Sequence, residues 1–567
     1  MKRSSTINRF SILVRSFGVT FMTAGLMSLP ECAFAAPPDA GQILRDTKPA
    51  PLTPAIQLQE VTPLIPEQVK PEKSVAPVDD VRVNVSRFTF SGNVNFSEAE
   101  LHAVVVDSEN KPLNFGELMA VVEKVEALYK KSGFFLAQAY LPPQKIKDGT
   151  IEINISEGVI GKTRLEGESR IKPEVIYAYL DKLTQGAAIK LVEIERQVLL
   201  INDLSGSHAT LDLQASDEAG KTDIVLAQKQ DNLFTGRVEL NNHGMPSTGQ
   251  NRTGVFINLN SPLKRGDRLS ANWVRSENGY LSNYGLSYEL PVGSNGWRFN
   301  LGTSLAEYSL GGDFSNLKAS GTVKAYHAGV SYPLLRSRSA NLLMKLDIAR
   351  NDLQDNFKAA GQKLDKFSNV LTATTNIDWL DEWLGGGSNR VELAVIGGNL
   401  NLGSEAKAQD TLDTGNGYSK ALITLQRDQT IRNDLIFNAQ LQHQQAFNNL
   451  DSSEKFSIGG PSTLPGYASG EASGDDATLA KLKLSWRVRY DMALGLFFDY
   501  AHVDAAHNPL ASTSNNSQHF SDAGLSLDWQ GSQGLNASVL VAWAGSEKPN
   551  PVDNDRPRVW ANFGYNW

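Results

Sequence analysis

The last nine residues, 559–567, constrain the fold most strongly, because apolar side chains alternate there without interruption with small or polar ones. In an extended strand, Phe563, Tyr565 and Trp567 lie on one face, and Asn562 and Asn566 lie on the other. A transmembrane β-barrel needs such an outward apolar face with aromatic residues near the membrane interfaces. The edge strand of a soluble sheet, which is the alternative, gives no reason for three successive aromatics on one face. The pattern therefore favours an outer-membrane barrel.

The N-terminus predicts how such a chain is exported. Four basic residues precede an apolar run over 17–29, and Ala33 and Ala35 flank Phe34 as in a small-x-small cleavage site. Residues 1–35 are therefore predicted to be a signal peptide. The single cysteine, Cys32, precedes the cut, so neither a disulfide nor thiolate chemistry is expected in the exported chain. A lipoprotein anchor on Cys32 is the alternative, but Glu31 stands where a lipobox needs a small residue.

The rest of the composition agrees with a barrel. Hydrophobic residues make up 41% of the chain, yet the mean hydropathy is −0.28 and no other stretch reaches the length of a membrane helix. Alternation spreads the apolar residues out instead of concentrating them. The formal net charge of −8 argues against a nucleic-acid partner.

Residues 36–80 are predicted to be a proline-rich linker, with nine prolines and one segment, 38–45, that could form a short helix. Because so short a helix is marginal in water, it needs a surface to pack against. The following 150 residues read twice as strand, helix, helix, strand, strand, over 81–158 and 159–230. One larger α+β domain is the alternative. The apolar stripe of the helix at 115–131 suits one face of a sheet.

Residues 231–567 show strand alternation and no persistent helical period. Over 481–490, for example, Lys481, Lys483, Arg487 and Arg489 share one face, opposite Leu482, Leu484 and Trp486. Four cations on one face of a membrane strand need the water of a barrel lumen. We count about sixteen strands, with fourteen and eighteen left open by boundary errors. The connections at 351–364 and 447–478 are expected to be long loops.

The loop at 447–478 is predicted to be folded, because it holds Ile458, Leu464 and Tyr467 among many turn-forming residues. Pro465-Gly466 is typical of a type II turn, in which glycine takes the positive φ. A barrel of sixteen strands leaves a lumen wide enough to receive such a loop. We call it the lumen loop; its candidate functional residues are Gly459, Gly460, Leu464, Pro465, Gly466, Tyr467, Glu471, Gly474 and Asp475.

These features resemble the two-partner-secretion transporters (TpsB) of the ShlB/FhaC/HecB haemolysin secretion/activation type, which belong to the wider outer-membrane assembly superfamily. The resemblance covers essentially the whole exported chain. The lumen loop is similar to the family's sixth extracellular loop, and residues 36–80 resemble its plug helix and linker. Phe497-x-Asp499-x-Ala501 resembles the strand motif that receives the loop, and alternation turns these three residues inward. The first POTRA domain is matched by Tyr129, Gly133, Ala139, Tyr140, Pro142, Gln144, Asp148, Gly149, Glu157 and Gly158.

Two positions depart from the family pattern. The loop's usual arginine is Pro465, and the strand's usual glycine is Ala501. The resemblance implies that Asp499 has lost the arginine that pairs with it, and a buried unpaired carboxylate is costly. Arg487 and Arg489, on the inward face of the neighbouring strand, are the predicted replacements.

The resemblance implies an outer-membrane translocator whose two periplasmic POTRA domains recognise an unfolded exoprotein, which then passes through the barrel. The exoprotein could be an adhesin, a cytolysin or a haem-related protein. Further expected partners are outer-membrane lipid and the barrel assembly machinery, for which Phe563, Tyr565 and Trp567 would be the signal. The competing interpretations are an assembly factor that inserts other barrels, and a passive porin or receptor.

No enzyme activity, cofactor, metal or nucleotide is expected. Gly161-Lys162-Thr163 lacks the first glycine of a phosphate-binding loop, since Ser156 stands there, and no Gly-x-Ser-x-Gly element occurs. The eight histidines show no metal-ligand spacing.

Overall fold

The computed structural model describes residues 37–47, 81–218, 220–511, 513, 515–545 and 557–567. The predicted signal peptide, with its cleavage site and Cys32, and the predicted linker at 48–80 lie outside these residues. Within them, no helix is both long enough and apolar enough to cross a bilayer.

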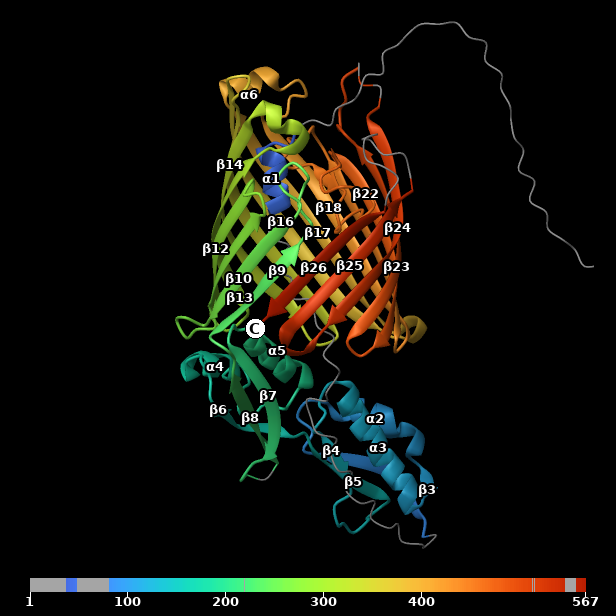
Figure 1. Ribbon diagram of the computed structural model, residues 1–567. Coiled ribbons are helices and arrows are strands. Elements are labelled where there is room, and N and C mark those ends of the chain that lie inside the picture. The colour runs from blue at the N-terminus through green and yellow to red at the C-terminus, as the bar shows by residue number, and fades with distance from the viewer. Residues whose placement is uncertain (1–36, 48–80, 219, 512, 514, 546–556) are drawn as a thin grey trace, which may run out of the picture. The chain divides into compact units, whose positions relative to one another are not determined.

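The C-terminal part of the chain is a closed barrel of sixteen antiparallel strands (Figure 1), which confirms the predicted strand number. The last strand pairs with the first, so the sheet has no free edge. The strands are β9 Phe234–Asn241, β10 Arg252–Asn260, β11 Arg268–Ser276, β12 Leu281–Val292, β13 Trp297–Ser309, β14 Ala319–Arg336, β15 Ala340–Phe357, β16 Gln362–Asp381, β17 Gly387–Leu402, β18 Gly417–Arg432, β19 Leu435–Ala446, β22 Asp476–Arg489, β23 Met492–Asp504, β24 Ser517–Gln530, β25 Leu535–Ala544 and β26 Arg558–Asn566.

The alternation predicted from sequence sets the two faces of the wall. On β23, Phe498 and Tyr500 are 50% and 39% exposed, whereas Asp499 is 1% exposed and faces inward. On β22, Leu482 and Trp486 are also exposed. Apolar side chains therefore cover the lipid face, and polar side chains line the interior, as a membrane barrel requires.

One predicted loop is wrong. Residues 351–364 were expected to form a long connection, but β15 and β16 extend through them and pair from Phe357↔Gln362 onward. Only Lys358–Gly361 remain as a turn. The outward positions there are polar, as in Arg350 and Asp352, so they lack the apolar alternation of a lipid-facing strand. A ladder that leaves the membrane keeps its hydrogen bonds but needs no apolar face, and the sequence pattern therefore ends before the strand does.

Two α+β units precede the barrel, as predicted. The first contains α2 Glu98–Val105, α3 Phe115–Lys131, the sheet β2 Arg87–Ser91, β5 Thr150–Ser156 and β4 Gln138–Tyr140, and the small pair β1 Val83–Val85 with β3 Lys111–Leu113. The second contains α4 Pro173–Leu180, α5 Leu191–Asn202 and the sheet β6 Val159–Gly167, β8 Lys221–Gln230 and β7 Ser207–Ala215. The expected strand at 83–90 is thus two strands, and β3 was not predicted.

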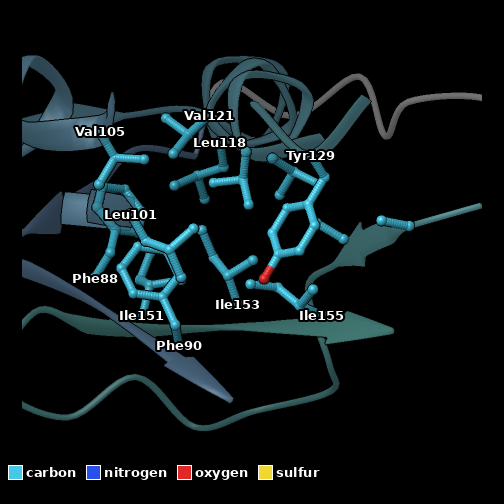
Figure 2. Packing of buried hydrophobic residues seen from close by; sticks show 14 of the residues in the cluster. Phe88, Phe90, Leu101, Val105, Leu118, Val121, Tyr129, Ile151, Ile153 and Ile155 are labelled. Atoms are coloured by element: carbon cyan, nitrogen blue, oxygen red, sulfur yellow. The ribbon is translucent and has the colours of Figure 1, made fainter. Parts of the chain in front are cut away.

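The helices of the first unit begin at sequence-encoded caps. Ser97 with Glu100, and Asn114 with Glu117, form reciprocal capping boxes at the starts of α2 and α3. Figure 2 shows Leu118 and Val121 packing above Ile151 and Ile153, which are two of the inward residues of β5. The helical stripe predicted for 115–131 therefore covers one face of the sheet.

Glu157 accepts hydrogen bonds at the edge of this core from the helix α3 and from the segment that follows β2. It accepts hydrogen bonds from the hydroxyl of Tyr129 at 2.9 Å, from the backbone N–H of Val94 and Asn95 at 2.8 Å each, and from Asn95 Nδ2 at 2.5 Å. Burial raises the pKa of Glu157, but the hydrogen bonds from Asn95, Tyr129 and Val94 outweigh it and leave the pKa below its ordinary range.

A folded-state pKa below the unfolded value means that Glu157 stabilises the unit above the unfolded pKa, and that this stability is lost as pH falls through the folded pKa. We expect Glu157→Gln to cost about 1–3 kcal/mol at neutral pH and to remove the acid-sensitive part of the stability. Hydrogen exchange of the amides in 83–158 of the full chain measures both effects. An unchanged acid dependence in the variant would assign it to other carboxylates. Glu126→Gln, at a partly exposed carboxylate of the same unit, is the matched control.

Candidate functional site: the lumen loop and the plug helix

The lumen loop, predicted at 447–478, is a folded element over 447–475 that joins β19 to β22, because the strand already begins at Asp476. It contains a small hairpin, β20 Phe456–Ile458 and β21 Ala472–Gly474, in which Ile458 pairs with Ala472. Gly459 and Gly460 follow β20 with positive φ values of 99° and 89°. A Cβ on Gly459 would lie 2.0 Å from the carbonyl oxygen of Ala468, so only glycine fits there. The backbone N–H groups of Glu471 and Gly460 close the hairpin by donating to Ala468 and Tyr467.

The apolar residues of the loop pack against the inner wall of the barrel. Ile458, Leu464 and Tyr467 are almost fully buried. The ring of Tyr467 meets Phe520 of β24 edge to face, with centroids 5.3 Å apart. The same cluster contains the inward-facing wall residues Ala477, Leu479, Ala501 and Val503. Ala501, the departure from the usual strand glycine, is fully buried under the loop.

Polar contacts also hold the tip of the loop, among them a hydrogen bond from the hydroxyl of Tyr467 to the carbonyl oxygen of Ser521 at 3.1 Å. The backbone N–H of Gly466 donates to Asp522 Oδ2 at 2.6 Å. Trp560 Nε1 donates to the carbonyl oxygen of Pro465 at 2.7 Å, and Lys481 Nζ donates to that of Ser462 at 2.7 Å. Sequence reasoning did not select Asp522 or Trp560. A signal was present at Trp560, because alternation places it on the polar, inward face of the last strand.

The turn at the tip differs from the prediction. Tyr467 N donates to Leu464 O at 3.1 Å, so a four-residue turn is present, but Gly466 has no positive φ and the turn is not type II. Glycine is required there because the loop backbone lies very close to the barrel wall. A Cβ on Gly466 would lie 2.7 Å from Asp522 Cβ and 3.0 Å from the backbone nitrogen of Ala544.

The predicted replacement for the missing loop arginine is wrong. Arg489 pairs with Asp491 at 3.2 Å. Arg487 lies opposite Ala493, and Asp499 lies six residues further along the same strand. At 3.3 Å per residue, this separates Arg487 from the row of Asp499 by about 20 Å. Asp499 instead stands in register with Lys481, whose Nζ lies 3.9 Å from Asp499 Oδ2.

Asp499 and Asp522 form a carboxylate pair behind the loop tip. They are register partners on β23 and β24, and both are 1% exposed. The row Lys481, Asp499, Asp522 thus places one lysine beside two buried carboxylates. Within the described residues, neither side-chain oxygen of Asp499 has a hydrogen-bond partner. Lys481 is therefore the cation of this row, and Asp522 is the carboxylate that contacts the loop directly.

Substitutions of three of the four cations on β22 separate these assignments. We expect Lys481→Met to weaken loop docking by about 1–3 kcal/mol, because it removes the bond to Ser462 and leaves buried carboxylates without their cation. Arg487→Met and Arg489→Met, the matched controls, are expected to leave docking unchanged. Protease cleavage within the lumen loop is the measurement. Faster cleavage in either arginine variant than in Lys481→Met would contradict the assignment.

The base of the loop is fixed by Asp475, which is fully buried. It accepts a bond from Lys455 Nζ at 2.6 Å, which also donates to Ala505 O. Its second oxygen accepts from the backbone N–H of His507 at 2.9 Å. Gly474 lies against Val503, where a Cβ would come within 2.3 Å of its side chain. The loop is therefore anchored at its base as well as at its tip.

A second folded element, α1 Ala40–Thr47, packs against the inner face of the barrel and is named here the plug helix. Asp39 caps it by accepting from Gln42 N at 2.9 Å. Ala40 N donates to Asp355 Oδ1 of β15 at 2.8 Å, and Tyr308 OH donates to the same carboxylate. The predicted segment 38–45 thus finds its packing surface.

The plug helix also contacts the lumen loop. Arg45 Nη1 donates to Lys455 O at 2.7 Å and Gln42 Nε2 donates to Gly470 O at 3.2 Å. Arg252 of β10 pairs with Asp46 at 2.5 Å. Gly41 lies against Ser452, where a Cβ would come within 2.2 Å of its hydroxyl. The helix is therefore held between the wall and the loop.

Lys366 of β16 joins these parts at one point. Its Nζ lies 3.1 Å from Asp39 Oδ2 of the plug helix cap and 2.8 Å from Asp451 Oδ2 at the start of the lumen loop. Ser452 Oγ accepts from Lys366 at 3.1 Å and donates to Asp39 at 2.5 Å. The lysine side chain is 8% exposed. One buried cation thus binds helix, loop and wall together.

The remaining predicted residues lie elsewhere on the chain. Phe563 and Tyr565, on the outer face of β26, and Trp567, which follows that strand, are between 40% and 46% exposed. Phe497 is buried next to Asp499 on the inner face of β23. In the part of the chain that the structure describes, no cluster of three or more His, Cys, Asp or Glu residues could hold a metal ion.

Residues 220–530 match the sequence profile of the haemolysin secretion/activation proteins ShlB/FhaC/HecB, and residues 83–158 match the ShlB-type POTRA domain. The first match spans more than half of the chain. The chain belongs to the ShlB/FhaC/HecB family. Among its relatives is the heme/hemopexin transporter protein HuxB of Haemophilus influenzae strain 86-028NP, 26% identical over 82% of this chain and 83% of its own length.

Other members are similar over most of their length. The outer membrane transporter CdiB of Escherichia coli is 23% identical over 71% of this chain and 68% of its own. The solved structure of E. coli CdiB superposes with a TM-score of 0.71 at 19% identity, covering 90% of this chain and 94% of that one. CdiB of Acinetobacter baumannii gives 0.62 at 15% identity over the same shares. At these identities the structures support the fold.

Membership in the ShlB/FhaC/HecB family identifies the protein as an outer-membrane transporter of the two-partner-secretion type. The barrel lies in the outer membrane and the POTRA region in the periplasm. Its relatives are named transporters. The family therefore favours the translocator over the assembly factor and the passive porin.

Proposed function

We propose that this ShlB/FhaC/HecB family member exports one partner exoprotein through the barrel lumen, after the plug helix and the lumen loop have moved aside. The polar anchoring of the plug helix carries this proposal. Asp39, Asp46 and Arg45 hold the helix through ion pairs and hydrogen bonds to the wall and the loop. Water can replace such contacts when the helix leaves, and the apolar residues that the helix adds to the interface are few, namely Ala40, Ile43 and Leu44.

The two α+β units supply a means of capturing an unfolded cargo. In the sheet β2-β5-β4, the strands β2 and β4 are edges, and in β6-β8-β7 the edges are β6 and β7. An extended chain can add a strand to such an edge, with affinity from main-chain hydrogen bonds and specificity from alternate side chains. A cargo unfolded in the periplasm presents the backbone groups that this binding needs, and its folding outside would give export its direction.

The partner is proposed to be a large β-rich exoprotein. HuxB is named a heme/hemopexin transporter and HpmB of Proteus mirabilis a hemolysin transporter, and both are related along most of this chain. A haem-related protein, a cytolysin and an adhesin would each suit this route as an extended chain that folds into β structure outside the cell. We further propose that Phe563, Tyr565 and Trp567 are read by the barrel assembly machinery and then contact lipid.

Deletion of the gene tests the proposed function. We expect one large exoprotein to disappear from the medium and the cell surface, and a plasmid copy of the gene to restore it. The abundance of unrelated outer-membrane barrels is expected to stay unchanged. A general loss of barrels would instead indicate an assembly factor, and an unchanged set of exoproteins would contradict the proposal.

A further inference from the structure

The seam that closes the barrel is its shortest strand pairing. Strands β26 and β9 share five register pairs, from Asn562↔Asn241 to Asn566↔Arg237. Each of these strands shares eight pairs with its other neighbour. Because a ladder's strength grows with its pairs, the seam is the weakest joint among the described strands of the wall.

A side chain lengthens this joint. Asn242, the first residue after β9, accepts from Ala561 N at 2.7 Å and donates from Nδ2 to Val559 O at 2.8 Å. Its backbone N–H also donates to Ala561 O at 3.2 Å. The amide of Asn242 therefore continues the ladder where the backbone of the first strand turns away.

The lumen loop bridges the same joint from inside. On one side, Trp560 of β26 donates to Pro465 O in a buried bond of 2.7 Å. On the other side, Ser469 Oγ donates to the carbonyl oxygen of His243 at 2.8 Å. The rings of His243 and Trp560 meet edge to face across the joint, with centroids 6.1 Å apart. Two loop residues four positions apart thus contact β26 on one side and, on the other, the segment that directly follows β9.

We propose that the lumen loop is a strap across the β9–β26 seam, and that Trp560 is the positioning residue that couples loop docking to seam closure. Pro465 has no guanidinium group with which to bind the wall. Its carbonyl oxygen makes a contact instead, and the donor, Trp560 Nε1, belongs to the closing strand β26. The loop binds β26 and the segment that follows β9, so undocking of the loop makes opening of the seam easier. Opening of the seam makes undocking easier by the same factor, because coupling between two sites is reciprocal.

Cleavage of the lumen loop by protease in the full-length protein, reconstituted in lipid, tests the proposal from the loop side. Trp560→Phe keeps an aromatic ring and removes the donor, and we expect cleavage to rise roughly tenfold. Ser469→Ala removes the contact to His243, just beyond the end of β9, and is expected to act in the same direction. Trp543→Phe, at an exposed tryptophan on the neighbouring β25, is the matched control and should leave the rate unchanged.

Variants that change the seam, with loop cleavage as the readout, provide the decisive comparison. Asn242→Leu weakens the seam without touching the loop, and the strap requires that it too accelerates loop cleavage. Cysteines replacing Asn241 and Asn562, which are register partners within disulfide reach, lock the seam when oxidised. Oxidation should reverse the effects of Trp560→Phe and Asn242→Leu, and reduction should restore them.

Loop cleavage in Trp560→Phe that is equally fast with the seam locked and unlocked would overturn the proposal, as would an Asn242→Leu variant with unchanged cleavage. Heat-dependent mobility in gels shows whether each variant has formed a closed barrel. If Trp560→Phe does not fold, Ser469→Ala with and without the lock gives the same test.

Discussion

Replacing Lys366 with methionine is expected to release the plug helix and open a conducting pore. The substitution leaves Asp39 and Asp451 facing each other without their shared cation, in a site where the lysine side chain is 8% exposed. Removing one partner from a buried ion pair costs about 3–5 kcal/mol. A penalty of that size shifts the balance toward the open state by roughly a hundredfold or more. Conductance across a planar lipid bilayer measures the open population.

Labelling gives a second readout of the same release. A cysteine replacing Ala40, which is fully buried, should react with a maleimide faster in Lys366→Met than in the parent. Lys363→Met on the same strand is the control, since Lys363 pairs with Asp365 at 3.2 Å in a site where both side chains are about half exposed. Such surface pairs contribute at most about 1 kcal/mol. Equal conductance in the two variants would remove Lys366 from the gating contacts.

The second large effect is expected for Gly466→Ala, which should undock the lumen loop. The added Cβ would meet Asp522 Cβ at 2.7 Å and the wall backbone at Ala544 at 3.0 Å, and neither can withdraw from a hydrogen-bonded strand. Overpacking and loss of the Gly466 bond to Asp522 together cost about 3 kcal/mol. We expect loop cleavage to rise at least about tenfold, and export of the partner exoprotein to fall.

Gly397→Ala is the matched control, because a Cβ at this barrel glycine meets nothing within 4 Å. It should leave both cleavage and export unchanged. If Gly466→Ala keeps the loop protected while export falls, the glycine would act on the cargo and not on docking. Retention of both protection and export would show that the tip can move away from Asp522 without consequence.

The fold could be predicted from sequence because each of its parts rests on a local pattern. Alternation over 481–490 and 559–567 identified the lipid face, and the stripe on α3 identified a helix over a sheet. The lumen loop was selected because Ile458, Leu464 and Tyr467 are apolar residues in a segment rich in turn formers. These signals depend on neighbours in sequence, and the period of two or of 3.6 residues reveals them.

The pairings could not be predicted, because they depend on register between strands far apart in sequence. Asp499 faces Lys481 and not Arg487 because β22 and β23 meet in that register. Lys366 lies beside Asp39 although 327 positions separate them. A single sequence shows which face a residue occupies, but a shift of two residues along a strand keeps the face and changes every partner. Trp560 was missed for a related reason, since its facing residue belongs to a loop.

The strands of this barrel are unequal in length, and the thickness of the surrounding bilayer must adapt to them. Strands β9 and β26 have 8 and 9 residues, about 30 Å of chain or less, which at a tilt near 45° spans about 20 Å. On the other side, β15 and β16 have 18 and 20 residues and span about twice that height. The hydrocarbon core of a bilayer is about 30 Å thick. Beside the short strands the bilayer must thin to match the height of the wall, whereas beside the long strands the wall is as tall as the core or taller. Membrane thickness should therefore act on this transporter at its seam, with thicker bilayers straining the joint and thinner ones relaxing it.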